Sequence, residues 1–214
     1  MASATYRARV LVLKRTKLGE TDCICTLLAE DGSQIRAVAK GARKPSSPFT
    51  SRLELFSLCD VLLVKGKTLD IIKEVRLLEA YPRVRQTLEL TEAASPIVEL
   101  LEKGSASNLE NNKLFPLSTK ALSCLNSNQT NPSSFLVITC AHLLKAVSFL
   151  GFKPELTTCI GCGKHIFEPS QSLNGSVSFS FLEGGSTCDS CAHEFETQWV
   201  ACDVIAMFSA ADDE

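Results

Sequence analysis

The chain has 214 residues, 45% of them hydrophobic, and a formal net charge of −2 at pH 7. This hydrophobic content is typical of globular proteins and excludes an intrinsically disordered chain, and the length suits one large domain or two to three small ones. The charge is unevenly divided, because residues 1–83 carry 15 Lys and Arg against 9 Asp and Glu, whereas residues 84–214 carry 7 against 15. We therefore expect a basic N-terminal module that binds a polyanion, followed by a more acidic remainder.

The N-terminal third is predicted to consist of strands and turns. The segments rich in strand-forming residues are 6–13, 22–29, 34–40, 53–64 and 68–78. Asp31-Gly32 between the second and third segments is a strong hairpin signal, and Lys65-Gly66-Lys67 joins the last two. Five short strands within roughly eighty residues predict a small barrel, either an OB-fold or an SH3-like barrel.

A change in hydrophobic period follows Tyr81-Pro82, which closes the barrel segment. The next apolar residues recur at helical spacing up to Gly104, which is expected to end a first helix. The residues that define this first helix are Leu90, Ala94, Ile97 and Leu101. Pro116 suits the first turn of a second helix.

Residues 135–150 are apolar on nearly every face and are predicted to form the buried central helix of a bundle. The segment is too short for a membrane span, and His142 and Lys145 interrupt it. A last helix is predicted over residues 195–208.

Two cysteine pairs, Cys159-Ile-Gly-Cys162 and Cys188-Asp-Ser-Cys191, carry the strongest chemical signal. Each C-x-x-C turn directs two thiolates at one point, and two such turns complete a tetrahedron of sulfur ligands that suits Zn²⁺. The spacing resembles that of a zinc ribbon. Because four sulfur ligands leave no open coordination position, the expected role of one bound zinc ion is structural.

These cysteines allow other interpretations. Residues 1–7 lack the apolar core of a signal peptide, so we expect a reducing cytoplasm, where disulfides are rare. No βαβ pattern surrounds either pair, which argues against a thioredoxin-like redox site. Iron in a rubredoxin-like site stays open, because the same ligands can bind it. His165 and His193 lie next to the pairs and are the alternative ligands.

Basic residues gather in the predicted loops of the barrel. Residues 40–52 contain four cations together with Phe49, and residues 14–17 and 65–67 are expected to be further basic turns. Loops that converge on one face with an aromatic platform suit single-stranded nucleic acid. The alternative is a solvated loop of ordinary lysines, with Phe49 in the core. The candidate contacts are Lys40, Arg43, Lys44, Arg52, Lys14, Arg15, Lys65 and Lys67.

No catalytic motif for phosphate, dinucleotide, metalloprotease or serine-hydrolase chemistry occurs, so we do not expect an enzyme. Three functions besides DNA binding stay open. The first is a zinc-ribbon and OB-fold factor that binds RNA in transcription or translation. The second is a metal-dependent nuclease or deaminase, which needs an open metal position. The third is a scaffold without affinity for nucleic acid.

Several stretches, in this order, carry a family resemblance. They are Gly19-Glu-Thr-Asp22, Lys40-Gly-Ala-Arg-Lys44, residues 48–53, residues 150–156 before the first cysteine pair, and Gly184-Gly185 before the second. Together they cover about residues 6–195 and resemble the bacterial DNA repair family RecO. Members of that family usually continue with more helix after the second cysteine pair, whereas this chain ends about twenty residues later.

The resemblance implies an α+β multidomain protein. An OB-fold would occupy residues 1–82, and a helical domain with an embedded zinc module at about 157–195 would occupy residues 83–214. It also implies a cytoplasmic recombination mediator, working at the bacterial nucleoid and not at a membrane. Such a protein binds single- and double-stranded DNA, anneals complementary strands and, with RecR, helps load RecA onto DNA covered by single-strand binding protein.

The same resemblance implies roles for individual residues. Lys40, Arg43, Lys44 and Arg52 match the positions expected to contact DNA. The family's bundle docks the acidic, apolar C-terminal tail of single-strand binding protein, and His142 and Lys145 are our candidates for that groove.

Overall fold

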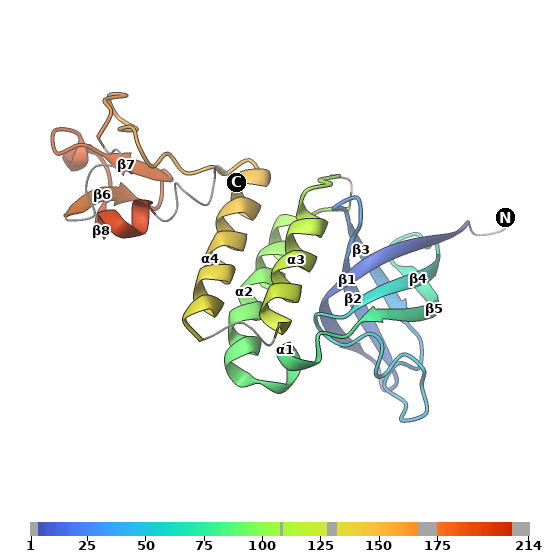
Figure 1. The fold of residues 1–214 in the computed structure, drawn as a ribbon. Helices are drawn as coiled ribbons and strands as arrows, with labels where there is room; N and C mark the ends of the chain where they lie inside the picture. Colours follow the sequence, from blue (N-terminus) through green and yellow to red (C-terminus); the bar gives the residue numbers. More distant parts are fainter. Residues whose placement is uncertain (1–3, 108, 128–131, 167–174, 207–214) are drawn as a thin grey trace. The chain divides into compact units, whose positions relative to one another are not determined.

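A computed structural model describes residues 4–107, 109–127, 132–166 and 175–206 (Figure 1). The chain forms two compact units, Met1–Leu143 and Leu144–Glu214. The predicted boundary between residues 82 and 83 falls inside the first unit, where strands give way to helices, and it stays a prediction as a domain boundary.

The first unit begins with a closed barrel in the order β1-β2-β3-β5-β4. Neighbouring strands are antiparallel except β3 and β5, which are parallel. A closed five-stranded barrel of this order is an OB-like fold, so this prediction is confirmed. The strands are β1 Thr5–Leu18, β2 Asp22–Ala29, β3 Gln34–Ala39, β4 Leu58–Val64 and β5 Asp70–Glu79.

Two predicted strand boundaries differ from the structure by several residues. β1 continues to Leu18, so residues 14–17 lie in a strand and not in a turn. β4 begins at Leu58 and not at residue 53, because Phe56 takes a left-handed φ of 69° that a strand does not allow. The backbone N–H of Phe56 donates to the carbonyl of Val12 at 3.1 Å, which fixes the turn against β1.

Inward-facing apolar residues fill the barrel. The buried thiols of Cys23, Cys25 and Cys59 belong to this core and behave as small hydrophobic side chains. Burial raises the pKa of Cys25 and Cys59 to about 12, so both stay protonated at neutral pH. Phe49 is partly buried and packs against the same core, which favours the core interpretation of this residue over a stacking platform.

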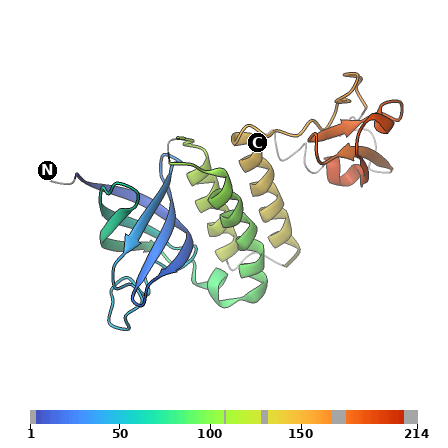
Figure 2. The same ribbon diagram turned by 180° about the vertical axis from the view of Figure 1, so that it is seen from behind.

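Helices follow the barrel, and Figures 1 and 2 show α2 and α3 side by side in both views. Helix α2 buries its predicted apolar residues and ends at Gly104, as expected. Helix α3 begins two residues before Pro116. The helices are α1 Pro82–Gln86, α2 Leu88–Gly104, α3 Leu114–Asn126 and α4 Pro132–Phe149.

Helix α4 is not buried on all faces, which corrects the prediction of a buried central helix. The hydroxyl of Thr139 donates to the carbonyl of Ala93 in α2 at 2.8 Å, so this side of α4 is packed. Leu136 and Val137 are exposed, because the packing on α2 and α3 covers only part of the helix surface. No helix among the described residues is long and apolar enough to cross a membrane.

The second unit contains a small sheet in the order β7-β6-β8. Its strands are β6 Ser176–Ser180, β7 Gly185–Thr187 and β8 Gln198–Ala201. The helix predicted over residues 195–208 is therefore wrong in its first part, because Trp199 and Val200 pair with β6 across from Ser178 and Val177. Residues 202–206 are helical, and 207–208 lie outside the described residues.

Candidate functional site

The four predicted cysteine ligands converge in the second unit. The sulfur atoms of Cys159, Cys162, Cys188 and Cys191 all lie within 4.8 Å of one another. Neither His165 nor His193 belongs to this group, within the part of the chain that the structure describes. The donor set is thus four thiols at the separation that one soft metal ion requires, and they could hold such an ion.

Backbone hydrogen bonds build the two cysteine turns. The N–H of Cys159 donates to Lys164 O at 2.8 Å, and the N–H of Gly163 donates to Cys159 O at 2.8 Å. Gly163 has a φ of 70°, which favours glycine. In the second turn, the N–H of Cys191 donates to Cys188 O at 3.0 Å. Local backbone hydrogen bonds therefore fix the conformation of both cysteine turns.

The electrostatics of the cluster differ between its members. Although burial opposes the shift, the backbone N–H groups of Cys188, Cys162 and Gly161 lower the pKa of Cys159 well below its ordinary value. The hydrogen bond with Cys188 and the neighbouring thiols raise the pKa of Cys191. One thiolate therefore forms readily, whereas ionisation of the whole cluster needs a cation to compensate the accumulated negative charge.

The cationic loop, residues 40–52, leaves the barrel after β3 and is anchored by the turn between β1 and β2. The carboxylate of Asp22 accepts a hydrogen bond from the N–H of Gly41 at 2.7 Å, and this bond lowers the pKa of Asp22. The N–H of Arg43 donates to Thr21 O at 2.8 Å, and its guanidinium donates to Gly19 O at 3.0 Å. The stretches 19–22 and 40–44, which both carry the family resemblance, therefore contact each other in the fold.

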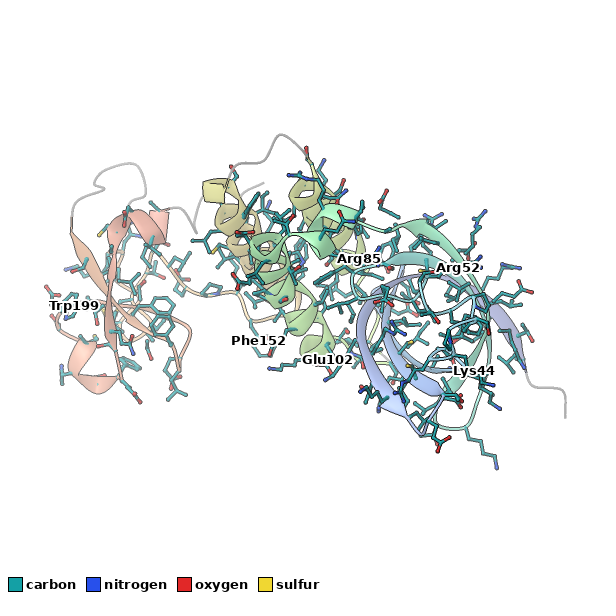
Figure 3. The ribbon with its side chains drawn as sticks, turned by 90° about the horizontal axis from the view of Figure 1, so that it is seen from below. Lys44, Arg52, Arg85, Glu102, Phe152 and Trp199 are labelled. Carbon is teal, nitrogen blue, oxygen red and sulfur yellow. The ribbon has the colours of Figure 1, made fainter. Side chains whose placement is uncertain are left out.

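The cationic side chains of the loop differ in their exposure and in the hydrogen bonds that they make. Lys40 and Lys44 are exposed, and Lys44 and Arg52 are labelled on the barrel in Figure 3. The hydroxyl of Thr50 donates to the carbonyls of Ala42 and Lys44 at 2.9 and 3.0 Å, which holds the loop in shape. The guanidinium of Arg52 donates to Val75 O of β5 at 3.1 Å and is partly tethered.

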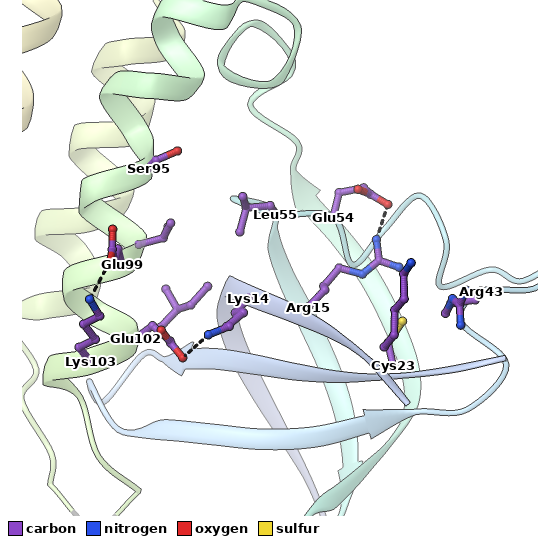
Figure 4. A pocket seen from close by; sticks show the side chains of 13 residues that line it. Lys14, Arg15, Cys23, Arg43, Glu54, Leu55, Ser95, Glu99, Glu102 and Lys103 are labelled. Carbon is purple, nitrogen blue, oxygen red and sulfur yellow. Dashed lines mark hydrogen bonds and ion pairs between the residues drawn. The ribbon is translucent and has the colours of Figure 1, made fainter. Parts of the chain in front are cut away.

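Lys14 and Arg15 lie with Arg43 in a cleft of about 700 Å³ between β1 and α2, called here the strand–helix cleft (Figure 4). Acidic residues hold both strand cations: Lys14 pairs with Glu102 of α2 at 2.9 Å, and Arg15 pairs with Glu54. Sequence reasoning missed both carboxylates, because nothing in the chain pattern links positions so far apart.

Lys65 and Lys67 line a different cleft, of about 600 Å³, together with Arg7 and Arg36. The ammonium of Lys65 lies 3.4 Å from the buried carboxylate of Asp70 and 5.7 Å from the ring centre of Tyr6. The structure thus groups Lys14, Arg15 and Arg43 in one cleft and Lys65 and Lys67 in another. Arg7 and Arg36 lie at exposed strand positions, and they are not among the candidate contacts predicted from the sequence.

His142 and Lys145, the candidates for a docking groove, lie in different surroundings. His142 is 2% exposed, and its Nε2 lies 2.9 Å from the hydroxyl of Ser118 in α3. Burial lowers its pKa to about 4, and its Nδ1 has no hydrogen-bond partner among the described residues. Lys145 is partly exposed in the second unit. Their role in docking stays a prediction.

Comparison with known proteins places these features in a family. Residues 1–81 match the family described as Recombination protein O N terminal, and residues 85–212 match Recombination protein O C terminal. The chain is 32% identical over 186 residues to the DNA repair protein RecO of Desulfitobacterium hafniense, an alignment that covers 87% of this chain and 64% of that protein. It is 33% identical over 207 residues to the RecO of Bifidobacterium longum, covering 96% and 81%. The chain therefore spans less than two thirds of the Desulfitobacterium relative's length.

Proposed function

We propose, because the chain belongs to the RecO family of DNA repair proteins, that it is a DNA-binding and strand-annealing recombination mediator and not an enzyme. One observation supports this most directly. The cationic loop is anchored through Asp22 and Arg43 on an OB-like barrel, so its charges are presented by a rigid scaffold.

The residue types of the loop explain how binding could serve annealing. Lys and Arg side chains contact phosphates and carry no sequence information, so binding would be independent of sequence. A protein that holds the backbone leaves the base edges free to pair with a complementary strand. In this proposal Lys40, Arg43 and Lys44 make the principal contacts with single- and double-stranded DNA. Arg52, Lys14, Arg15, Lys65 and Lys67 complete the set.

The cysteine cluster would hold one structural Zn²⁺. When bound, the ion cross-links the two cysteine turns, and Cys159, Cys162, Cys188 and Cys191 would be its ligands. Four thiolates leave no position for a substrate, so the metal would stabilise the second unit and not take part in a reaction. Iron is the alternative ion for this donor set.

The partners proposed for the whole protein follow from the family. They are RecR, the C-terminal tail of single-strand binding protein and, indirectly, RecA, at the nucleoid in the cytoplasm. His142 and Lys145 are the candidates for docking the tail. Because His142 is buried against Ser118, such docking would require the side chain to be uncovered.

Fluorescence anisotropy of a labelled single-stranded oligonucleotide at several salt concentrations tests the proposal. We expect salt-sensitive binding that the Arg43→Ala/Lys44→Ala variant weakens, with a salt slope that falls in magnitude by about 0.7 for each phosphate that is no longer neutralised. Lys73→Ala/Lys120→Ala is the matched control, because it removes the same charge from exposed positions outside the loop.

The competing function is an RNA-binding factor of transcription or translation. A structured RNA that competes more strongly than single-stranded DNA would support that alternative. Equal binding by wild type and the loop variant would contradict the proposed site.

A further inference from the structure

We infer that Glu102 of α2 is an internal competitor of DNA: its carboxylate binds Lys14 in the free protein, and a DNA phosphate takes its place in the complex. This inference rests on the proposed function and adds a regulatory contact to the same surface. It assigns the strand–helix cleft as a continuation of the DNA path from the cationic loop.

The geometry of the pair makes it exchangeable. The ammonium of Lys14 lies 2.9 Å from the Oε1 atom of Glu102, and the two side chains are 53% and 27% exposed. Figure 4 shows Lys14 extending from β1 toward the carboxylate on α2. Solvent screens an ion pair of this exposure, so little free energy is lost when another anion replaces the carboxylate.

The backbone around Glu102 is fixed, which keeps the carboxylate at the cleft. The side-chain amide of Gln34 in β3 donates to Glu102 O at 2.9 Å and also to Ser105 O at 3.2 Å. The end of α2 is thereby joined to the barrel independently of the ion pair. Exchange at Lys14 would therefore alter a charge contact without detaching the helix.

The neighbouring ion pair provides a contrast. Arg15 binds Glu54, and its side chain is only 20% exposed. Electrostatic attraction to Glu54 raises the pKa of Arg15 although burial opposes the shift. Separating this pair would leave a partly buried charge without its partner, which is unfavourable. Of these two strand cations, Lys14 is therefore the one that can exchange its partner, whereas Arg15 would meet DNA with Glu54 still bound.

The position of the cleft connects Lys14 to the cationic loop. Arg43 of that loop lines the same cleft (Figure 4). Lys17 of β1 lines it as well. A phosphate backbone that runs from the loop toward α2 would meet Lys17 and then Lys14. Glu102 stands where such a backbone would arrive, and its negative charge opposes binding until it is displaced.

The test compares single-stranded DNA binding by wild type, Glu102→Gln and Glu92→Gln. Glu92 is the matched control, because it is exposed on the same helix and does not line the cleft. We expect Glu102→Gln to bind DNA up to about fivefold more tightly, the scale of an exposed ion pair. Glu92→Gln should give a smaller change, due to the lower negative charge of the chain.

A second comparison isolates Lys14. In a Lys14→Ala background, the gain from Glu102→Gln should shrink to that of Glu92→Gln, and Lys14→Ala alone should reduce the salt slope by about 0.7. Equal effects of the two Gln variants, or an unchanged salt slope in Lys14→Ala, would overturn the inference. If the wild type binds no DNA at low salt, the proposed function itself fails. If it binds through Arg43 and Lys44 but shows no Glu102 effect, only this inference fails.

Discussion

The carboxylate of Asp22 accepts a 2.7 Å hydrogen bond from the backbone N–H of Gly41, where the cationic loop leaves β3. The hydroxyl of Thr21 donates to the same carboxylate oxygen at 3.0 Å. Two stretches that lie about twenty residues apart in the sequence thus meet at one anchor. The cations that follow Gly41 depend on this anchor for their position on the barrel.

Replacing Asp22 by Ala should therefore weaken DNA binding although every cation is still present. We expect affinity for single-stranded DNA to fall roughly two- to tenfold, because the loop loses one of the hydrogen bonds that position it. Removing a negative charge would by itself tighten binding, so a decrease is diagnostic of impaired positioning. Asp60→Ala is the control, because Asp60 lies on β4 and pairs with Arg76. Tighter binding by both variants would show that the anchor does not matter.

His142 should make stability depend on pH. Its folded-state pKa is about 4 because of burial, whereas an unfolded chain binds the proton near pH ~6.5. The unfolded state therefore binds more protons between these values. The contribution of neutral His142 to stability is complete above about pH 6.5 and is lost as the pH falls, by up to about 3 kcal/mol.

Urea unfolding at about pH 7.5 and about pH 5 measures this dependence. The difference between the two conditions should be smaller in His142→Gln than in wild type. Comparison of variants cancels the effect of acid on the cysteine cluster. An identical pH dependence in wild type and His142→Gln would show that this histidine is not the responsible group.

Removing one cluster sulfur should remove the metal. Cys162→Ser is expected to lower the bound zinc from about one ion per chain to near zero, and to make residues 157–195 sensitive to protease, because metal binding is coupled to local folding. Cys124→Ser is the control, since Cys124 lies on α3 outside the cluster. Elemental analysis of purified protein gives the metal and its amount. Full metal retention by Cys162→Ser would argue for a site with fewer ligands.

A single methyl group at Gly161 should also disturb the cluster. A Cβ atom at this position would lie 3.0 Å from Cys191 Cβ and 3.1 Å from Cys191 Sγ, closer than side chains normally pack. We expect Gly161→Ala to release zinc to a chelator faster than wild type. Ser190→Ala, within the other cysteine turn, should release it at the wild-type rate. Equal rates for all three proteins would mean that the two turns lie farther apart than these distances.

The barrel could be predicted because its signals are local. Alternating β-formers and the Asp31-Gly32 turn specify strands, and strand number and length then limit the possible folds. The boundary errors have local causes as well. The left-handed backbone of Phe56 has no sequence signature, and Trp199 and Val200 lie in a segment that also fits helical spacing but forms strand pairs with β6.

The site could be predicted only in part, for a different physical reason. The cysteine cluster is encoded by two short motifs, and its convergence follows from ligand spacing. Glu102, the partner of Lys14, is 88 residues away in the sequence and lies on helix α2. The sequence therefore gives no indication of this pair. Long-range ion pairs of this kind decide which cations are available, and only the fold shows them.

A strand-annealing assay measures the activity that we propose for the cationic loop. Two complementary oligonucleotides carrying a donor and an acceptor dye are mixed with the protein, and the rate of energy transfer is recorded for wild type, Arg43→Ala/Lys44→Ala and Lys73→Ala/Lys120→Ala. Wild type and the Lys73/Lys120 control should accelerate annealing, whereas the loop variant should lose most of the acceleration. Annealing by the loop variant at the wild-type rate, or no acceleration by folded, metal-loaded wild type, would contradict the proposed function.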